Sequence, residues 1–248
     1  MTKLGVRGRR RSLMAKTASP RKADEVSKEI LFRIVSGQIA PGTLLPKEEE
    51  LEAEFGVGRS VVREAVKLLE VHRLVLPVRR RGTVVLDPRA SLSPEVVAAF
   101  LDRRTGPSAH AFLVGLLEVR KLLDVEMAGL AAARRTDEDI TALRKSTEVF
   151  AARAAAGEDV EDAVLAFGLV IASATKNPIY TMLVHWNSAA VRELRPVFAG
   201  VRASAGAHAQ GLAMVVEAIT RGDVNEARQL TALFHDWSGP QIVAAASR

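Results

Sequence analysis

Two arginines set four positions apart are the residues best suited to recognition chemistry in this sequence. Arg59 and Arg63 open a segment of helical periodicity, so both guanidinium groups should project from one face, one turn apart. A guanidinium fork can bond O6 and N7 of a guanine. Ser60 and Val61 lie between them, at the tip that a recognition helix presents to base edges. The spacing predicts contact with DNA; an ion pair with a glutamate of the preceding helix is the alternative for Arg63.

A second basic group is expected in a tight turn. It consists of Arg79, Arg80, Arg81 and Gly82. The flanking segments 74–78 and 83–86 are rich in Val and Leu, which predicts two short strands joined by this turn. Three positive charges at the tip of a hairpin beside a recognition helix are suited to contact phosphate. A solvated run of charge is the other interpretation.

Charge is unevenly distributed along the chain. Residues 1–22 carry eight basic residues and no acid, so the remainder sums to −2 within a net charge of +6. A nearly neutral body with a basic arm indicates an anionic polymer as partner. A disordered tail without a specific role is equally open, and Met14 leaves open a later start of translation.

Composition and motifs exclude several classes of function. The chain has no cysteine, hence no disulfide, thiolate metal site or cysteine nucleophile. It has no nucleotide-binding glycine motif, no nucleophile elbow and no acidic pair at useful spacing, so we expect neither an enzyme nor a cofactor. The longest charge-free stretch, 177–191, is shorter than the roughly 20 residues of a membrane span. A cytoplasmic protein is expected.

Periodicity predicts the elements that position these residues. Helices are expected from Ala23, over about 47–55 and over 59–71, followed by the hairpin; this is a winged helix-turn-helix. Residues 87–94, with two prolines, indicate a linker. The rest is predicted to be helical at 94–104, 108–134, 137–156, 159–176, 178–201, 203–221 and 224–245, with a kink at Pro196. The fold class is therefore mainly α: a winged helix-turn-helix plus an all-α antiparallel helical bundle.

A run of fixed positions passes through the first domain. It reads PGTLLPKEEELEAEFGVGRSVVREAVKLLE from Pro41 and RRRGTVV from Arg79. By these residues the segment resembles the DNA-binding domain of the GntR family of transcription regulators. The helical remainder resembles the FCD-type C-terminal domain of the FadR-like subfamily, with weaker matches at Arg120-x-x-x-Asp124, 171–178 and 218–227.

The resemblance implies a domain order and a function. Residues 1–22 would be a basic, disordered tail, 23–88 the DNA-binding domain, and 89–248 the domain that binds an effector and dimerises. The expected protein is an effector-responsive repressor that binds a palindromic operator in double-stranded DNA as a homodimer. The alternative is a constitutive, architectural DNA-binding protein whose helical domain only dimerises.

Two departures from the family pattern bear on DNA binding. Many members have arginine where this chain has Glu49, so one habitual contact is expected to be missing. Glycine is usual at the positions of Arg73 and Arg80. Arg80 would carry a backbone penalty if its turn requires a positive φ.

A third departure concerns a metal. Many FCD-type domains hold a divalent ion through an aspartate and three histidines, and these positions fall on Val164, Gly168, Leu212 and Phe234. None of these side chains can coordinate a metal. His208 lies one helical turn before Leu212, and His235 directly follows Phe234. Neither has a carboxylate–histidine pair opposite, so no metal is expected. Either an apolar pocket replaces the site, or Leu212 and Phe234 fill it.

Arg120 is the expected anchor for an anionic effector. The resemblance implies an arginine that points into the bundle, and a guanidinium suits a carboxylate or phosphate. An i,i+4 pair with Asp124 is the equally weighted alternative. Tyr180, His185 and Arg192 are further candidates, from a helix rich in polar groups. An apolar pocket with one cation predicts an amphipathic acid as the effector.

Overall fold

The computed structural model describes residues 19–194 and 205–246 and divides the chain between Leu92 and Ser93 into two compact units. We call them the N-terminal unit and the helical unit. The division lies inside the segment 87–94 that its prolines mark as a linker. Within that segment Asp87 caps a short 3-10 turn, Pro88–Ala90.

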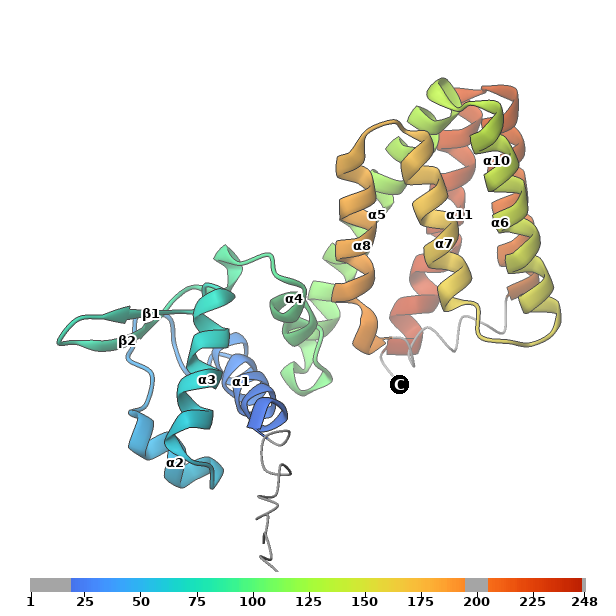
Figure 1. Cartoon of the computed structure of the whole chain (residues 1–248). Coiled ribbons are helices and arrows are strands. Elements are labelled where there is room, and N and C mark those ends of the chain that lie inside the picture. The colour runs from blue at the N-terminus through green and yellow to red at the C-terminus, as the bar shows by residue number, and fades with distance from the viewer. Residues whose placement is uncertain (1–18, 195–204, 247–248) are drawn as a thin grey trace, which may run out of the picture. The chain divides into compact units, whose positions relative to one another are not determined.

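The N-terminal unit is a winged helix-turn-helix (Figure 1). Its elements are α1 (Ser19–Val35), α2 (Glu48–Phe55), α3 (Arg59–Val71), β1 (Val75–Val78) and β2 (Gly82–Val85). The strands pair antiparallel, from Val75 opposite Val85 to Val78 opposite Gly82, and we call this hairpin the wing. α1 begins at Ser19 rather than at the expected Ala23.

The core of this unit comes from apolar residues at helical spacing. Ile30 and Ile34 of α1 and Val62 and Leu69 of α3 are almost completely buried. They lie on facing stripes, which is the arrangement that period-3.6 patterns predict. Val66, which follows the same helical spacing, is only partly buried.

The loop before α2 is attached to the wing. The backbone N–H of Leu45 donates to the carbonyl of Thr83 over 2.8 Å, and Val85 donates to Thr43 over 2.9 Å. In the first turn of α2 the N–H of Lys47 donates to the Glu50 carboxylate at 3.0 Å. The start of α2 is therefore fixed relative to β2.

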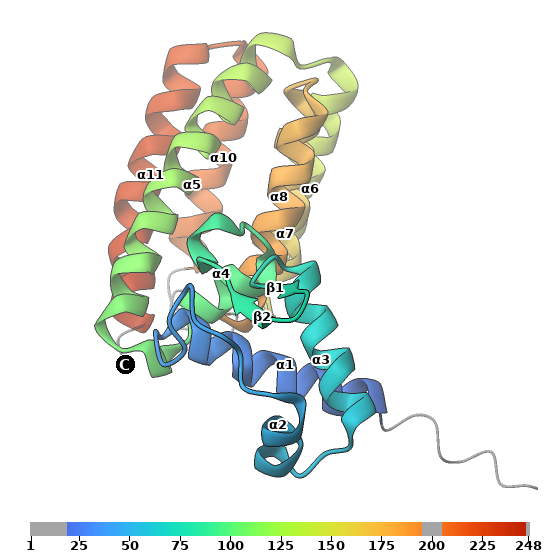
Figure 2. The same ribbon diagram turned by 90° about the vertical axis from the view of Figure 1, so that its left-hand side faces the viewer.

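The helical unit is an all-α bundle. It comprises α4 (Pro94–Phe100), the 3-10 turn Arg103–Thr105, α5 (Pro107–Arg134), α6 (Asp137–Ala155), α7 (Glu161–Ala174), α8 (Pro178–Ala190), the 3-10 turn Arg192–Leu194, α10 (Ala205–Arg221) and α11 (Val224–Ala246). Two views at right angles show α5 and α11 side by side along most of their length (Figures 1 and 2). None of the helices in the described part of the chain combines the length and apolar character needed to cross a membrane.

Its core is built from aromatic and small side chains. Phe150 of α6 and Ile219 of α10 are completely buried, and Ala128, Ala131 and Ala132 let α5 approach its neighbours closely. A smaller cluster around Val97, Leu101 and Leu113 joins α4 to the beginning of α5 and the end of α8.

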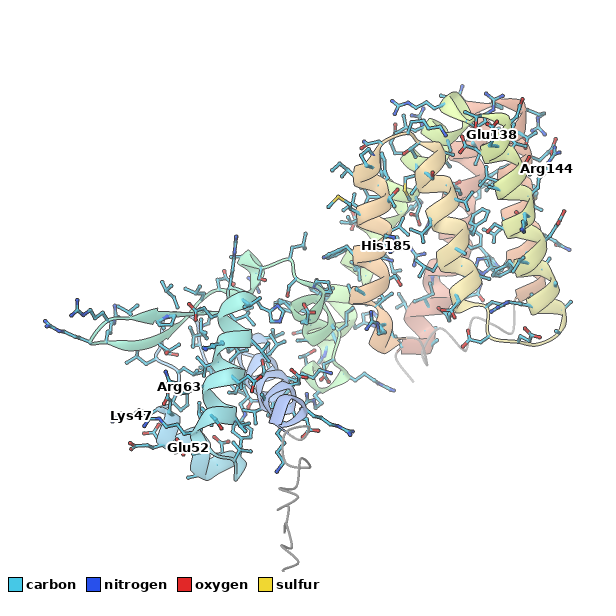
Figure 3. The ribbon with its side chains drawn as sticks, viewed as in Figure 1. Lys47, Glu52, Arg63, Glu138, Arg144 and His185 are labelled. Carbon is cyan, nitrogen blue, oxygen red and sulfur yellow. The ribbon has the colours of Figure 1, made fainter. Side chains whose placement is uncertain are left out.

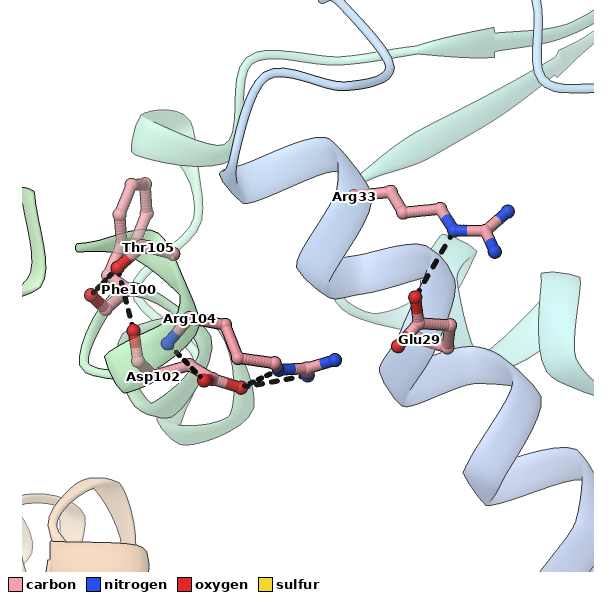
Figure 4. A network of polar contacts seen from close by, with 6 residues as sticks. All are labelled: Glu29, Arg33, Phe100, Asp102, Arg104 and Thr105. Atoms are coloured by element: carbon pink, nitrogen blue, oxygen red, sulfur yellow. Dashed lines mark hydrogen bonds and ion pairs between the residues drawn. The ribbon is translucent and has the colours of Figure 1, made fainter.

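Two of the expected helices end well before their predicted last residue. The helix expected over 94–104 ends at Phe100, because the Asp102 side chain accepts from the N–H of Arg104 at 2.9 Å and Thr105 Oγ1 donates to the Asp102 carbonyl at 2.7 Å (Figure 4). Such local side-chain bonds compete with helical ones. The helix expected over 178–201 ends at Ala190. Pro196 and its predicted kink lie outside the described residues.

Candidate functional site

The first turns of α3 expose the residues predicted to meet DNA. Arg59 is 71% exposed and Arg63 62% exposed in their side chains, and Ser60 is exposed between them. Arg63 projects from α3 toward the beginning of α2 (Figure 3). Val61 differs: it is only 8% exposed, because its position faces the core with Val62. Val61 therefore leaves almost no surface to a ligand, and its backbone N–H already donates to the Gly58 carbonyl at 2.9 Å.

Both arginines are bound to one carboxylate. Glu48, the first residue of α2, accepts from Arg59 Nε at 2.9 Å and lies 3.7 Å from Arg63 Nε. The hydrogen bond that Arg59 donates to Glu48 raises the pKa of Arg59 above its usual value, so this guanidinium stays fully charged. The ion pair considered for Arg63 as an alternative to DNA contact is thus present in the free chain. The departure at Glu49 adds a further exposed acid beside it.

The wing places its basic turn in solvent. Arg79, Arg80, Arg81 and Gly82 are all exposed, and the three arginines form no ion pair with any residue between 19 and 194 or 205 and 246. Arg80 has φ 62 and Arg73 has φ 57, so both positions at which glycine is usual keep the left-handed conformation. The turn therefore retains the geometry that glycine would favour, with an arginine in it.

A cavity of about 600 Å³ lies inside the helical unit. Its walls come from α5, α7, α8, α10 and α11. All four positions that the family resemblance would assign to metal ligands line it: Val164, Gly168, Leu212 and Phe234. Leu212 and Phe234 form part of the wall, which favours the apolar pocket over the filled core.

The cavity offers no ligand set that fits a metal. The four wall positions have no donor atoms, and the described residues contain no group of three or more His, Asp or Glu placed to hold an ion. Hard or borderline divalent ions need several N or O donors. His208 and His235 both line the cavity, but each is engaged otherwise.

Arg120, Asp124 and His235 form a polar chain on the cavity wall. Arg120 Nε donates to Asp124 Oδ2 at 3.3 Å, and His235 Nε2 lies 3.0 Å from the same oxygen. Burial raises the pKa of Asp124, but His235 and Arg120 outweigh that effect and hold the pKa below its usual value. Asp124 is therefore a carboxylate that joins α5 to α11. The i,i+4 pair weighed against the anchor role for Arg120 is present, in a residue that also lines the cavity.

His208 is enclosed by two aromatic rings. Its ring centroid lies 4.7 Å from that of Phe150 and 4.6 Å from that of Phe234. Burial, followed by the charges of Arg120 and His235, lowers the pKa of His208 to about 4. The imidazole is neutral at pH 7 and contributes an apolar surface with one donor and one acceptor.

The polar residues of α8 and the turn after it are divided between two faces. Tyr180 and Arg192 line the cavity, and so does Asn187. His185, predicted to bind an effector, is exposed and outside the cavity lining, although it is on the same helix (Figure 3). The 100° turn between helical residues separates it from its neighbours.

The Asp124–His235 pair was not predicted, because residues 111 positions apart give no sequence signal of contact.

Comparisons with known proteins agree with this architecture. Residues 22–85 match the family described as bacterial regulatory proteins, gntR family, and residues 115–234 match the FCD domain. The Bacillus subtilis (strain 168) transcriptional regulator LutR is 32% identical over 161 residues, which cover 64% of this chain and 71% of LutR. The chain belongs to the GntR family. The named relatives are transcriptional regulators, and so the FadR-like, FCD-type resemblance read from the motifs is confirmed at the level of GntR and FCD.

Other GntR relatives extend the comparison. The uncharacterised regulator Rv0494 of Mycobacterium tuberculosis is 35% identical over 66% of this chain and 65% of its own length, and the Escherichia coli K12 uxu operon regulator is 34% identical over 67% and 63%. The matched segment thus spans about two thirds of each relative. Among solved structures, Lar, which controls expression of the Listeria monocytogenes agr system, has a TM-score of 0.58 at 19% identity, covering 91% of this chain and 96% of Lar. That likeness supports the mainly α fold.

Proposed function

We propose that this GntR-family chain is a transcription regulator that binds double-stranded DNA in the cytoplasm and releases it in response to a small molecule. The observation that carries the DNA-binding part is the exposed basic surface of α3 and the wing, on a winged helix-turn-helix. In this proposal residues 23–88 bind DNA, and residues 89–248 bind the effector and dimerise. The expected sign is repression at a pseudo-palindromic operator.

The two basic groups have different roles in this proposal. Arg59, Ser60 and Arg63 read base edges in the major groove, because a guanidinium can distinguish guanine there. Arg79, Arg80, Arg81 and Gly82 contact phosphates, which gives affinity without sequence information. Val61 supports the helix from inside the unit and has no part in the contact.

The effector proposal rests on the cavity and on the free edge of Arg120. The Nε of Arg120 is engaged by Asp124, and its Nη groups form no hydrogen bond with any described residue. The surrounding wall is apolar at Val164, Leu212 and Phe234. A cavity of about 600 Å³ falls within the usual range for small-molecule sites. This combination favours an amphipathic acid, whose carboxylate meets Arg120 while its hydrocarbon part covers the wall.

Further polar groups would orient such a ligand. The Tyr180 hydroxyl and Arg192 lie at the same cavity, whereas His185 does not. A small hydrophilic diacid is disfavoured, because it would leave the apolar wall at Val164, Leu212 and Phe234 uncovered.

One experiment tests both halves of the proposal. A DNA duplex is selected from a random-sequence library with the wild-type protein, and its Kd is then measured with and without decanoate, phenylacetate, citrate and gluconate. Decanoate or phenylacetate should weaken binding roughly 5- to 150-fold, the usual span of allosteric coupling. Arg120→Ala should bind the duplex as wild type does but lose the response.

The control is Arg144→Ala, which removes an exposed arginine from α6, away from the cavity lining (Figure 3). It should retain both DNA binding and the response. Thermal unfolding of each variant with decanoate provides a second reading, because a ligand that binds the folded state raises Tm. A response to citrate or gluconate alone would contradict the amphipathic class, and no response to any acid would favour the constitutive alternative.

A further inference from the structure

Glu48 joins the two arginines through a single carboxylate. Its Oε2 accepts from Arg59 Nε at 2.9 Å, and its Oε1 lies 3.7 Å from Arg63 Nε. Each oxygen therefore serves a different guanidinium, and the two arginines are one helical turn apart on α3. Both contacts use the Nε edge of the arginine.

The position of Glu48 is set by the backbone around it. It is the first residue of α2, directly after a loop that is hydrogen-bonded to β2, and Leu51 in the same turn is 1% exposed. The Glu48 side chain itself is 38% exposed, so it lies at the edge of the surface on which the arginines lie. The fixed start of α2 thus holds the Glu48 carboxylate beside α3.

The use of Nε leaves the other edge of each guanidinium free. Neither arginine has an Nη hydrogen bond to any residue in the described ranges. The two Nη groups of one guanidinium form a parallel pair of donors, and such a pair matches O6 and N7 of guanine. A carboxylate on Nε also removes much of the rotational freedom of a long side chain before DNA arrives, which lowers the entropy lost on binding.

We propose that Glu48 is a positioning residue for sequence recognition: it holds Arg59 and Arg63 by Nε and presents their Nη edges to the bases. This inference rests on the proposed DNA-binding function. The negative charge of Glu48 also repels the phosphate backbone, and so it lowers affinity for every DNA sequence. Glu48 therefore increases discrimination while it reduces general affinity.

Neighbouring acids provide a matched control. Glu49 lies in the same turn of α2 and Glu52 one turn later, and both act on Arg59 only through their charge, without a hydrogen bond. Glu49→Ala thus removes the same charge as Glu48→Ala but leaves both contacts with the arginines. Glu48→Asp makes the complementary change, since it keeps the charge and shortens the reach.

The measurement is the ratio of two dissociation constants, for the duplex selected from a random library by wild type and for a scrambled duplex of equal length. Arg59→Ala sets the scale: losing one bidentate guanine contact should reduce the ratio roughly 5- to 150-fold. Glu48→Ala should lower the ratio by about 10-fold and tighten binding to the scrambled duplex. Glu49→Ala should tighten both duplexes equally and leave the ratio unchanged. Glu48→Asp should lower the ratio without tightening the scrambled duplex.

The outcomes separate this inference from the function on which it rests. If Glu48→Ala and Glu49→Ala have equal effects on both duplexes, then Glu48 acts only through its charge. That result would overturn this inference and leave the proposed DNA-binding function intact. A higher ratio for Glu48→Ala would also overturn it, since Glu48 would then compete with the bases for the arginines. If the wild-type protein selects no preferred duplex, the proposed function fails together with the inference.

Discussion

Arg73 and Arg80 are held in a backbone conformation that their side chains disfavour. Their φ angles, 57 and 62, lie in the left-handed region, which costs an L-residue roughly 1–2 kcal/mol relative to the right-handed one. Arg80 occupies the turn of the wing, where its charge is fully available to phosphate. The sequence therefore exchanges some stability for charge at the tip of the wing.

Replacing Arg80 by glycine should separate these two effects. Arg80→Gly should raise the free energy of unfolding of the N-terminal unit by roughly 0.5–1 kcal/mol, because relief of the left-handed strain exceeds the entropy that glycine adds to the unfolded chain. Affinity for all DNA sequences should fall, and the slope of log K against log salt should decrease by about 1. Urea unfolding followed by circular dichroism and Kd values over a salt series measure the two quantities.

Arg79→Ala is the control for this prediction. It removes a charge from the same turn without changing a positive φ, so it should reduce the salt slope without stabilising the unit. An Arg80→Gly protein that is less stable than wild type would show that the Arg80 side chain makes a stabilising contact that outweighs the strain.

Helix ends illustrate what could be predicted from the sequence at the level of elements. The helices beginning at Asp137 and Pro178 start where Thr136 and Asn177 cap them, as their residue types indicate. The break after Phe100 was not predicted, because it depends on Asp102 folding back on the Arg104 backbone. Similarly, Asp159 accepts from the N–H of Glu161 and delays the start of α7. A local side-chain bond of this kind competes closely with a helical bond, and periodicity does not decide between them.

The candidate sites likewise divide into features that the sequence predicted and features that depend on tertiary packing. Helical spacing was sufficient to place Arg59 and Arg63 together, and family positions were sufficient to bring Val164 and Phe234 to one cavity. Val61 is buried and His185 is exposed because of the elements that pack against α3 and α8. The spacing of residues along the sequence does not define those neighbours. The contacts of Glu48 with α3 likewise could not be predicted, because they depend on the conformation of the turn between α2 and α3.

The buried His208, which lies where α6, α10 and α11 meet, should make the stability of the helical unit depend on pH. Its pKa is about 4 in the folded chain against 6.5 for the free side chain, so the unfolded chain binds more protons between these values. Stability should therefore fall as pH drops from about 6.5 to about 4, by up to roughly 3 kcal/mol. Asp124, with its lowered pKa, should add a further loss only below about pH 4.

Urea unfolding of the wild type and of His208→Phe at pH 7, 6, 5 and 4 tests this assignment. Phenylalanine keeps an aromatic ring between Phe150 and Phe234 but cannot be protonated. The variant should lose most of the slope between pH 6.5 and 4 and keep the loss at lower pH. An unchanged slope in the variant would assign the pH dependence to other groups.

At the scale of the whole molecule, the chain has an exposed basic surface on one unit and a cavity in the other. A signal between them needs an element whose arrangement the ligand can change. The polar chain from Arg120 through Asp124 to His235 connects α5 with α11 at the cavity wall, where a bound ligand would contact it. Lys121 with Asp236 at 2.5 Å and Glu126 with Arg228 at 2.9 Å join the same two helices. A ligand carboxylate bound at the free Nη groups of Arg120 would act on this connection through the Arg120 guanidinium.

The helical unit also retains large apolar side chains on its surface. Leu122 of α5, Met182 of α8 and Leu233 of α11 are all exposed. Apolar side chains exposed on a folded domain are available for burial in an interface between two copies of the chain. A two-fold axis through such an interface would present two α3 helices to two half-sites of opposite orientation.

We therefore expect a dimer of the 26.7 kDa chain, which binds one duplex with two chains. Sedimentation equilibrium of the free protein should give twice the mass of the chain. A duplex with two inverted half-sites should bind far more tightly than a duplex with one, because the second contact is then intramolecular. Moving the half-sites apart by five base pairs should abolish this advantage, since it places them on opposite faces of the helix. Binding as a single chain, with equal affinity for one and two half-sites, would contradict the dimer and would leave each N-terminal unit to recognise its site alone.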